Sequence, residues 1–353
     1  KTRPDNGLVV SGYTADWGDV SPVYPDHRAV YLDEDTPKVT GSYSNIMFYK
    51  ALNRLAGMFD KLGNTEQASL WKNRAQNLRK KINQNFWQGA YYTMHHDILP
   101  PQNKKATKQD LDISQHIFPM GGNAEALLAG VASKDKARSI LKTAKARQLK
   151  YEINDIGAVL LPPFPDGFFQ HPGMQKKYSY QNGGIWDWFS GRFVLGLYKY
   201  GFADHASKEL TSICERILQS NGIYEYYAPD GKGKGSSSYT GAAAVMGQSI
   251  VQGLYGITSH QGNYDITIRL ADNDGWIRLH EPGQSQTLTY HYDVEPDRIQ
   301  VDLNVDGNRG INSLRIRKHG KKWKQVMVNG QELDYLKDCS NQVCYYDLTK
   351  AIK

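Results

Sequence analysis

The spacing of apolar residues changes near residue 258, and this change constrains the fold more than any other feature of the sequence. From about residue 42 to residue 257, apolar side chains recur every three or four positions, as on one face of a helix. After Ile257 the runs become short and alternate between apolar and polar residues, as in strands. The sequence therefore predicts a mainly α domain over residues 1–258 and a small all-β, sandwich-like domain over residues 259–353.

The helical region reads as a series of helix pairs. We expect Gly63 and Gly201 to end helices, and Asn64 and Ser133 to cap the helices that follow. Antiparallel pairs separated by long loops favour an α/α toroid over a bundle, because bundles use short loops at both ends. The expected pairs lie at residues 44–82, 121–147 and 185–222.

Three loops between the helices combine aromatic residues with carboxylates or amides. They read "GYTADWGDVSP" (12–22), "KYSYQNGGIWDWFSG" (177–191) and "GIYEYYAPDGKGKGSSSYTG" (222–241). Loops held by a rigid scaffold are frequent functional sites. Sugars need this combination, because their C–H faces lie on aromatic rings while their hydroxyls pair with Asp, Glu and Asn. The sequence therefore predicts a carbohydrate site.

The same loops resemble those of a known superfamily. "YQNGGIWDW" is similar to the Y-x-N-G-x-x-W loop of the six-hairpin glycosidases, which fold as (α/α)6 barrels. The third loop resembles the E-x-Y-x-P-x-T/D-G-x-G segment of the group that contains processing α-glucosidase and mannosylglycerate hydrolase. "DVSP" resembles the D-x-S-P pattern in the acid-bearing loop of that group. The resemblance covers about residues 1–258 and implies a glycoside hydrolase that inverts configuration.

The resemblance implies a role for individual carboxylates. It places the general base on Glu225 and the general acid on Asp19, with Asp16 as an alternative acid. A general acid must keep its proton near neutral pH, and an indole and a second carboxylate, both supplied by "DWGD", raise a carboxyl pKa. The side chains expected to contact the sugar are Trp17, Tyr180, Asn182, Trp186, Tyr224 and Tyr226.

Two other functions stay open. A non-catalytic sugar-binding protein on the same scaffold would keep the aromatic residues without a working acid. Val23 favours it, because the family pattern has arginine at this position. A toroid polysaccharide lyase would need a Tyr/His or Tyr/Arg pair and an acidic sugar, which the net charge of +7 permits.

Composition and cysteine usage bound the partners and the compartment. No apolar stretch reaches about 18 residues, so no membrane span is expected, and no nucleic-acid motif accompanies the basic runs. Cys214 falls on the apolar side of a helix, which predicts a buried thiol. A disulfide between Cys339 and Cys344 would imply an oxidising compartment, so we expect a periplasmic or extracellular protein.

No cofactor and no metal ion are expected. His95, His96 and Asp97 are adjacent potential ligands, but neighbouring side chains of an extended segment point to opposite faces.

The number of helices predicts an incomplete barrel. A closed barrel of six helix pairs needs more helices than the roughly seven periodic segments found here. Asp19 also lies close to the first residue, whereas the acid of the family follows several hairpins. We therefore expect that the N-terminal helices are lacking, and that a companion segment or a second copy of the chain completes the barrel.

Overall fold

A computed structural model describes residues 6–26, 36–99, 108–260, 263–270, 273–281, 285–296, 298–307, 310–317, 325, 327–328, 330–332, 336–340 and 343–349. The chain forms two compact units. The first, largely helical, comprises Lys1–Leu197 and Glu209–Met246, and the second, largely of strands, comprises Tyr198–Lys208 and Gly247–Lys353.

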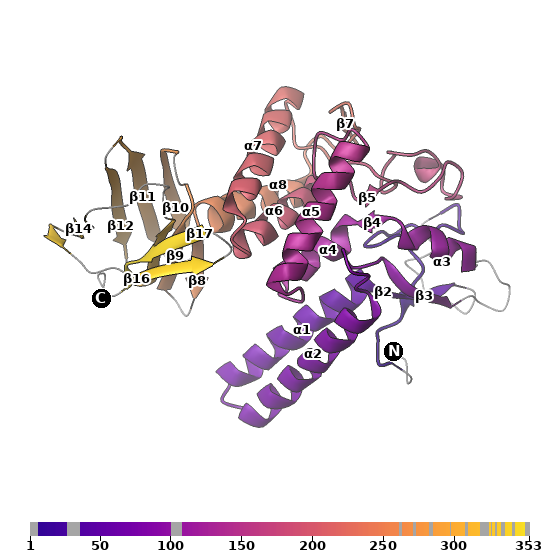
Figure 1. Ribbon diagram of the computed structural model, residues 1–353, viewed down its shortest axis with the longest axis horizontal. Helices are drawn as coiled ribbons and strands as arrows, with labels where there is room; N and C mark the ends of the chain where they lie inside the picture. Colours follow the sequence, from indigo (N-terminus) through magenta and orange to yellow (C-terminus); the bar gives the residue numbers. More distant parts are fainter. Residues whose placement is uncertain are drawn as a thin grey trace. The chain divides into compact units, whose positions relative to one another are not determined.

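Helices dominate the described part of the chain up to residue 254. In chain order they are α1 (Ser42–Lys61), α2 (Thr65–Asn85), α3 (Lys108–Gln115), α4 (Met120–Leu128), α5 (Lys134–Lys150), the short 3-10 helix η2 (Pro172–Met174), α6 (Asp187–Lys199), α7 (Ala203–Ser220), α8 (Thr240–Gln248) and the π-helical segment η3 (Ser249–Leu254). The helices α1 and α2 lie side by side as a hairpin (Figure 1). Helices occur in all three ranges expected for helix pairs, and the α1–α2 pair is confirmed.

The helix ends follow local chemistry. Gly63, at a φ of +74°, terminates the α1 turn, and the Asn64 side chain accepts the amide of Gln67 at 3.1 Å. The Ser133 hydroxyl accepts the amide of Lys136 at 3.3 Å and caps α5. The caps predicted from the sequence are confirmed.

Short antiparallel ladders hold the loops of the first unit. The strands are β1 (Ser11–Gly12), β2 (Lys38–Gly41), β3 (His95–Leu99), β4 (Phe118–Pro119), β5 (Leu160–Leu161), β6 (Tyr226–Tyr227) and β7 (Gly233–Lys234). They pair as β1–β2–β3, β4–β5 and β6–β7. Because β1 directly precedes residues 13–22, and β6–β7 lies within residues 222–241, the first and third loops are each attached to a ladder.

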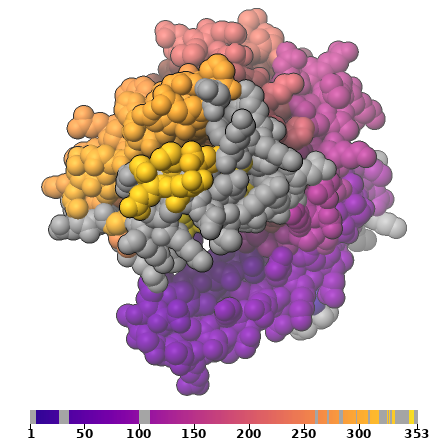
Figure 2. Space-filling view, turned by 60° about the vertical axis from the view of Figure 1, so that its left-hand side comes forward, coloured from indigo at the N-terminus to yellow at the C-terminus, as the bar shows by residue number. Residues whose placement is uncertain are grey.

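The second unit contains two larger sheets; in the space-filling view of Figure 2 the described residues of this part of the chain are coloured orange to yellow. One has the order β16-β17-β13-β9-β8 and the other the order β10-β11-β12, and β14–β15 form a further small pair. Buried residues of both larger sheets, among them Ile266, Tyr290 and Leu314, belong to one hydrophobic core. The strands are β8 (Ile257–His260), β9 (Asn263–Ile268), β10 (Gly275–Glu281), β11 (Gln286–Val294), β12 (Ile299–Asp306), β13 (Ile311–Arg317), β14 (Met327–Val328), β15 (Gln331–Glu332), β16 (Leu336–Ser340) and β17 (Val343–Asp347).

The structure bears on the expectations about membrane spans and cysteines. Within the described residues, no helix combines the length and the apolar character that crossing a bilayer requires. Cys214 is half-buried rather than buried, so its prediction as a core thiol is wrong, and its thiol is free. Cys339 and Cys344 are paired positions in the β16–β17 register, but their side chains lie outside the described residues.

Candidate active site

The three loops singled out by the sequence meet in the first unit. The side-chain amide of Gln181 donates to Asp19 Oδ1 at 2.8 Å, which ties the second loop to the first. Ile185 and Tyr227 exchange two backbone hydrogen bonds of 2.9 and 2.8 Å, which tie the second loop to the third. Tyr180 has a left-handed φ of 44°, a conformation that costs energy in a residue with a side chain and that often occurs at functional sites.

Aromatic rings from all three loops form one cluster around Trp186. The Trp186 ring lies 5.0 Å from Trp17 and 5.2 Å from Tyr180, edge to face in both cases. It stacks on Tyr226 with centroids 5.6 Å apart and an angle of 16°, and it meets Tyr239 edge-on at 6.3 Å. Trp186 itself is buried, so the half-exposed rings around it form the accessible part of the cluster.

Two carboxylates flank this cluster. Asp19 is exposed and Glu225 is half-buried. Burial is the largest cause that raises the pKa of Tyr180, and the negative charges of Asp19 and Glu225 raise it further. Burial is also the largest cause that raises the pKa of Tyr239, and the charges of Glu225 and Asp19 raise it further. Both carboxylates therefore act electrostatically on the same two phenols, although they come from opposite ends of the helical region.

The third loop folds back over Glu225. The backbone amide of Glu225 donates to Ser236 at 2.8 Å, and the Ser236 amide approaches the Glu225 carboxylate at 3.4 Å. Gly235 has a φ of +69°, and a Cβ at this position would collide with the Glu225 carboxylate. Glycine is therefore required here because the backbone passes directly against the acid.

Asp16 occupies a different environment from Asp19. Its carboxylate is buried and accepts the amide of Gly122 at 3.0 and 3.2 Å, at the start of α4. A Cβ on Gly121 would lie 2.6 Å from Asp16 Oδ2, so only glycine allows this approach. Burial raises the pKa of Asp16 to about 7, while the amides of Gly122 and Gly121 lower it. The raised pKa expected of the first loop thus falls on Asp16, and its main cause is burial rather than the neighbouring indole.

Three residues predicted to contact sugar, Asn182, Trp186 and Tyr224, differ in their burial and in their contacts. Asn182 is fully buried, where its side chain accepts the amide of Phe164 at 2.8 Å and donates to three backbone carbonyls. Trp186 donates from its indole to the Tyr180 carbonyl at 3.0 Å and forms the centre of the cluster. Tyr224 is half-buried and packs against Tyr227 with centroids 5.7 Å apart.

A buried ion-pair network supports the start of α6, directly after Trp186. Arg216 donates to Asp187 at 2.5 Å and to Asp155 at 2.9 Å. Burial raises the pKa of Asp187 to about 6, and Arg216 opposes this effect. The network fixes the segment that carries the central tryptophan.

Two residues of the cluster were missed by the sequence reasoning. Gln181 lies between Tyr180 and Asn182 in the second loop, and no pattern in the sequence predicts its contact with Asp19. Tyr239 ends the glycine- and serine-rich stretch of the third loop, and its aromatic character beside that stretch was the available signal.

The adjacent histidines serve the fold of the first unit. The His95 ring is buried and donates from Nε2 to the Thr14 carbonyl at 2.8 Å, and burial lowers its pKa to about 4. Among the described residues, no group of three His, Cys, Asp or Glu side chains is arranged to hold a metal ion.

Comparison with known proteins identifies a glycoside hydrolase family. Residues 16–240 match the family described as "Mannosylglycerate hydrolase MGH1-like glycoside hydrolase domain". A mannosylglycerate hydrolase from Rubrobacter radiotolerans is 26% identical over 228 residues, which are 63% of this chain and 46% of that protein. The chain thus spans about half the length of this curated relative.

Two solved structures show how far the likeness of fold extends. A structure titled "Sialidase" has a TM-score of 0.58 at 14% identity, over 86% of this chain and 28% of the other. The GH63 mannosylglycerate hydrolase from Thermus thermophilus in complex with glucose has a TM-score of 0.44 at 18% identity, over 63% of this chain and 51% of the other. The second likeness is too weak to compare folds, and the first concerns the fold alone.

Paired carboxylates beside half-exposed aromatic rings, carried on helix pairs, are typical of carbohydrate-active domains. The matched range includes Asp19, Tyr180 and Glu225 and covers more than half of the chain. The chain belongs to the MGH1-like glycoside hydrolase family.

Proposed function

We propose that this chain carries both catalytic carboxylates of a glycoside hydrolase. Asp19 would protonate the oxygen of the leaving group, and Glu225 would activate a water molecule. The observation that supports this most is that the second loop joins the loops of both acids: Gln181 donates to Asp19 at 2.8 Å, and Ile185 exchanges backbone hydrogen bonds with Tyr227, two residues after Glu225. Two carboxylates that face the same rings from different loops can flank a sugar that lies against those rings.

The reaction we propose inverts the anomeric configuration. In that case the two carboxyl groups should lie about 6.5–9.5 Å apart with substrate bound, which leaves room for the water. Asp19 suits the role of acid because it is exposed, so a leaving group can reach it, and because the Gln181 side chain orients its carboxyl group beside the aromatic cluster. Asp16 suits a structural role, because its carboxylate is buried against α4.

The sugar would lie against the accessible rings of the cluster. Trp17, Tyr180 and Tyr226 are half-exposed and supply flat faces with adjacent hydroxyls. We assign Trp186 and Asn182 to positioning these rings, because both side chains are buried and their polar atoms bond the backbone.

The relatives suggest a first substrate. Because the curated relative carries the name mannosylglycerate hydrolase, we propose a small glycoside of this kind, a sugar linked to a small acid. The net charge of +7 is compatible with a negatively charged substrate.

Aryl glycosides and mannosylglycerate test the proposal. We expect Glu225→Gln and Asp19→Asn to lower turnover by about 10²–10⁴-fold, the usual contribution of a general acid or base. Asp230→Asn, an exposed aspartate of the same third loop, is the matched control and should keep its activity. A good leaving group should partly rescue Asp19→Asn, and proton NMR of the first product should show inversion. Binding without any hydrolysis by the wild type would favour the sugar-binding protein, and ultraviolet-absorbing unsaturated products would favour the lyase.

We also propose that the helix pairs form part of an (α/α)6 toroid and that the two large sheets pack as a sandwich. Met58 and Leu62 in the α1–α2 hairpin are 61% and 77% exposed, and covering such side chains is favourable by about 25 cal/mol per Å². A companion helical segment or a second copy would supply that cover. Native mass spectrometry should show the companion or a dimer, and a fully active lone monomer would contradict this part of the proposal.

A further inference from the structure

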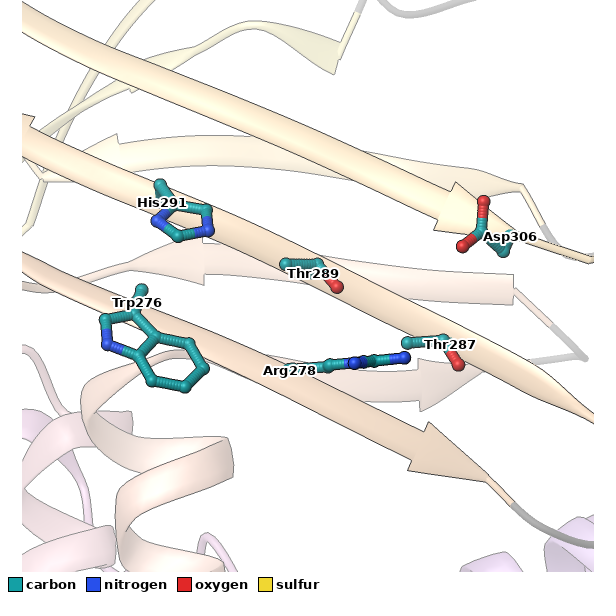
Figure 3. Close-up of a pocket in the computed structure, with 6 residues that line it drawn as sticks. All are labelled: Trp276, Arg278, Thr287, Thr289, His291 and Asp306. Atoms are coloured by element: carbon teal, nitrogen blue, oxygen red, sulfur yellow. The ribbon is translucent and has the colours of Figure 1, made fainter.

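The outward side of the β10–β11–β12 sheet carries an unusual set of side chains. Along β10 and β12, alternate residues are exposed, while those between them are partly buried and pack on the core of the second unit. The antiparallel register pairs Trp276 with His291, and Thr287 with Asp306, across adjacent strands. Figure 3 shows these four side chains with Arg278 and Thr289 on the three strands.

Trp276 is the main apolar feature of this surface. Its side chain is 63% exposed, although tryptophan is highly buried on average. The ring stacks on His291 with centroids 6.0 Å apart and an angle of 15°. We call these two neighbouring rings the platform: the Trp276 ring packs on a side chain of the adjacent strand while most of its surface stays exposed.

Polar side chains surround this platform. Arg278 makes no ion pair or hydrogen bond with any residue that the structure describes, so its donors remain available. Asn304 donates to Asp306 at 3.0 Å and holds that carboxylate at the edge of the set. Arg278 and Asp306, together with Thr287, Thr289 and the two rings, line a shallow hollow of about 360 Å³, which lies within the usual range for small-molecule sites.

We propose that this hollow is a second carbohydrate-binding site, separate from the carboxylate pair, which binds a neutral oligosaccharide. The C–H face of a sugar ring can lie on Trp276, while its hydroxyls meet donors on Arg278 and acceptors on Asp306. Charges of both signs line the hollow, so no single ligand charge is favoured, and one exposed ring is too small an apolar area for a stable protein interface. The inference does not depend on the proposed hydrolysis.

Affinity electrophoresis in native gels tests the site. The wild type is run in gels that contain a mannan, an α-glucan, a xylan or, for comparison, polygalacturonate. We expect at least one neutral polymer to retard the wild type, and Trp276→Ala to weaken this binding by roughly tenfold or more, as for the loss of a central aromatic anchor. Asp306→Asn should weaken it less, because asparagine keeps one acceptor oxygen.

Leu218→Ala is the matched control, because Leu218 is 79% exposed and its replacement also removes an exposed apolar side chain. It should bind like the wild type, and Trp276→Ala should keep the wild-type melting temperature and its activity on an aryl glycoside. Glu225→Gln should still be retarded, which separates failure of this site from failure of the proposed catalysis. Absence of retardation by every neutral polymer, equal retardation of Trp276→Ala, or retardation by polygalacturonate alone would each overturn the proposal.

Discussion

Replacing Asp16 with asparagine separates the two aspartates of the first loop, because the fold gives them opposite environments. Asp16 is buried against the start of α4, whereas Asp19 is exposed beside the aromatic cluster. We expect Asp16→Asn to remove a large part of the pH dependence of folding stability.

The magnitude follows from the pKa of Asp16, which burial raises from 3.8 to about 7. The folded protein therefore holds this proton more tightly than the unfolded chain does. The stability that this group contributes is fully present below about pH 3.8 and is lost as the pH rises through about 7. At about 1.4 kcal/mol per pH unit, the loss approaches about 4 kcal/mol, a large fraction of the stability of a typical domain.

Urea unfolding of the wild type and of Asp16→Asn, at about pH 4.5 and about pH 8, measures this loss. Subtracting the pH difference of Asp16→Asn from that of the wild type cancels the other titrating groups. We expect about 2–4 kcal/mol for Asp16→Asn. Asparagine keeps an oxygen that can accept the Gly122 amide, so the variant should fold.

Equal pH dependence in the wild type and in Asp16→Asn would refute the burial argument. A second outcome concerns catalysis. If Asp16→Asn loses more turnover than Asp19→Asn, and a good leaving group restores it, the general acid is Asp16 rather than Asp19.

Three substitutions test the packing of the first unit, and one measurement tests the cysteines of the second unit. Gly121→Ala should destabilise the protein by about 1–3 kcal/mol, because its Cβ would lie 2.5 Å from the Trp17 ring. Gly57→Ala, in α1 with nothing within 4 Å of its Cβ, should instead stabilise it by about 0.5–1 kcal/mol, and equal melting temperatures for the two variants would contradict this packing. Asn182→Ala should cost about 2–4 kcal/mol in chemical unfolding, because it leaves buried backbone groups of Phe164 and Met174 without partners, and wild-type stability would disprove that role. If the protein is exported, unreduced mass spectrometry should show a bridge between Cys339 and Cys344 as the loss of two hydrogens, whereas two free thiols would remove the argument for an oxidising compartment.

The sequence alone determined the local structure of this chain. The three- and four-residue spacing of apolar positions predicted the helix pairs, and Asn64 and Ser133 cap their helices as expected, since a cap depends only on residues within one turn. Runs that alternate between apolar and polar residues predicted the strands after residue 257, because alternation is also a property of neighbouring residues.

The tertiary structure alone decided how the residues of the three loops are used. Local pattern cannot distinguish Asp16 from Asp19, which lie three residues apart in one loop, because their difference comes from contacts with distant segments. Gly122 in α4 buries the first, and Gln181 in the second loop holds the second at the surface. The same holds for Asn182, whose side chain bonds the backbone of Phe164, 18 residues earlier in the chain. Burial and partnership are set by segments that meet only in the folded chain, and these properties determine which acid can reach a substrate.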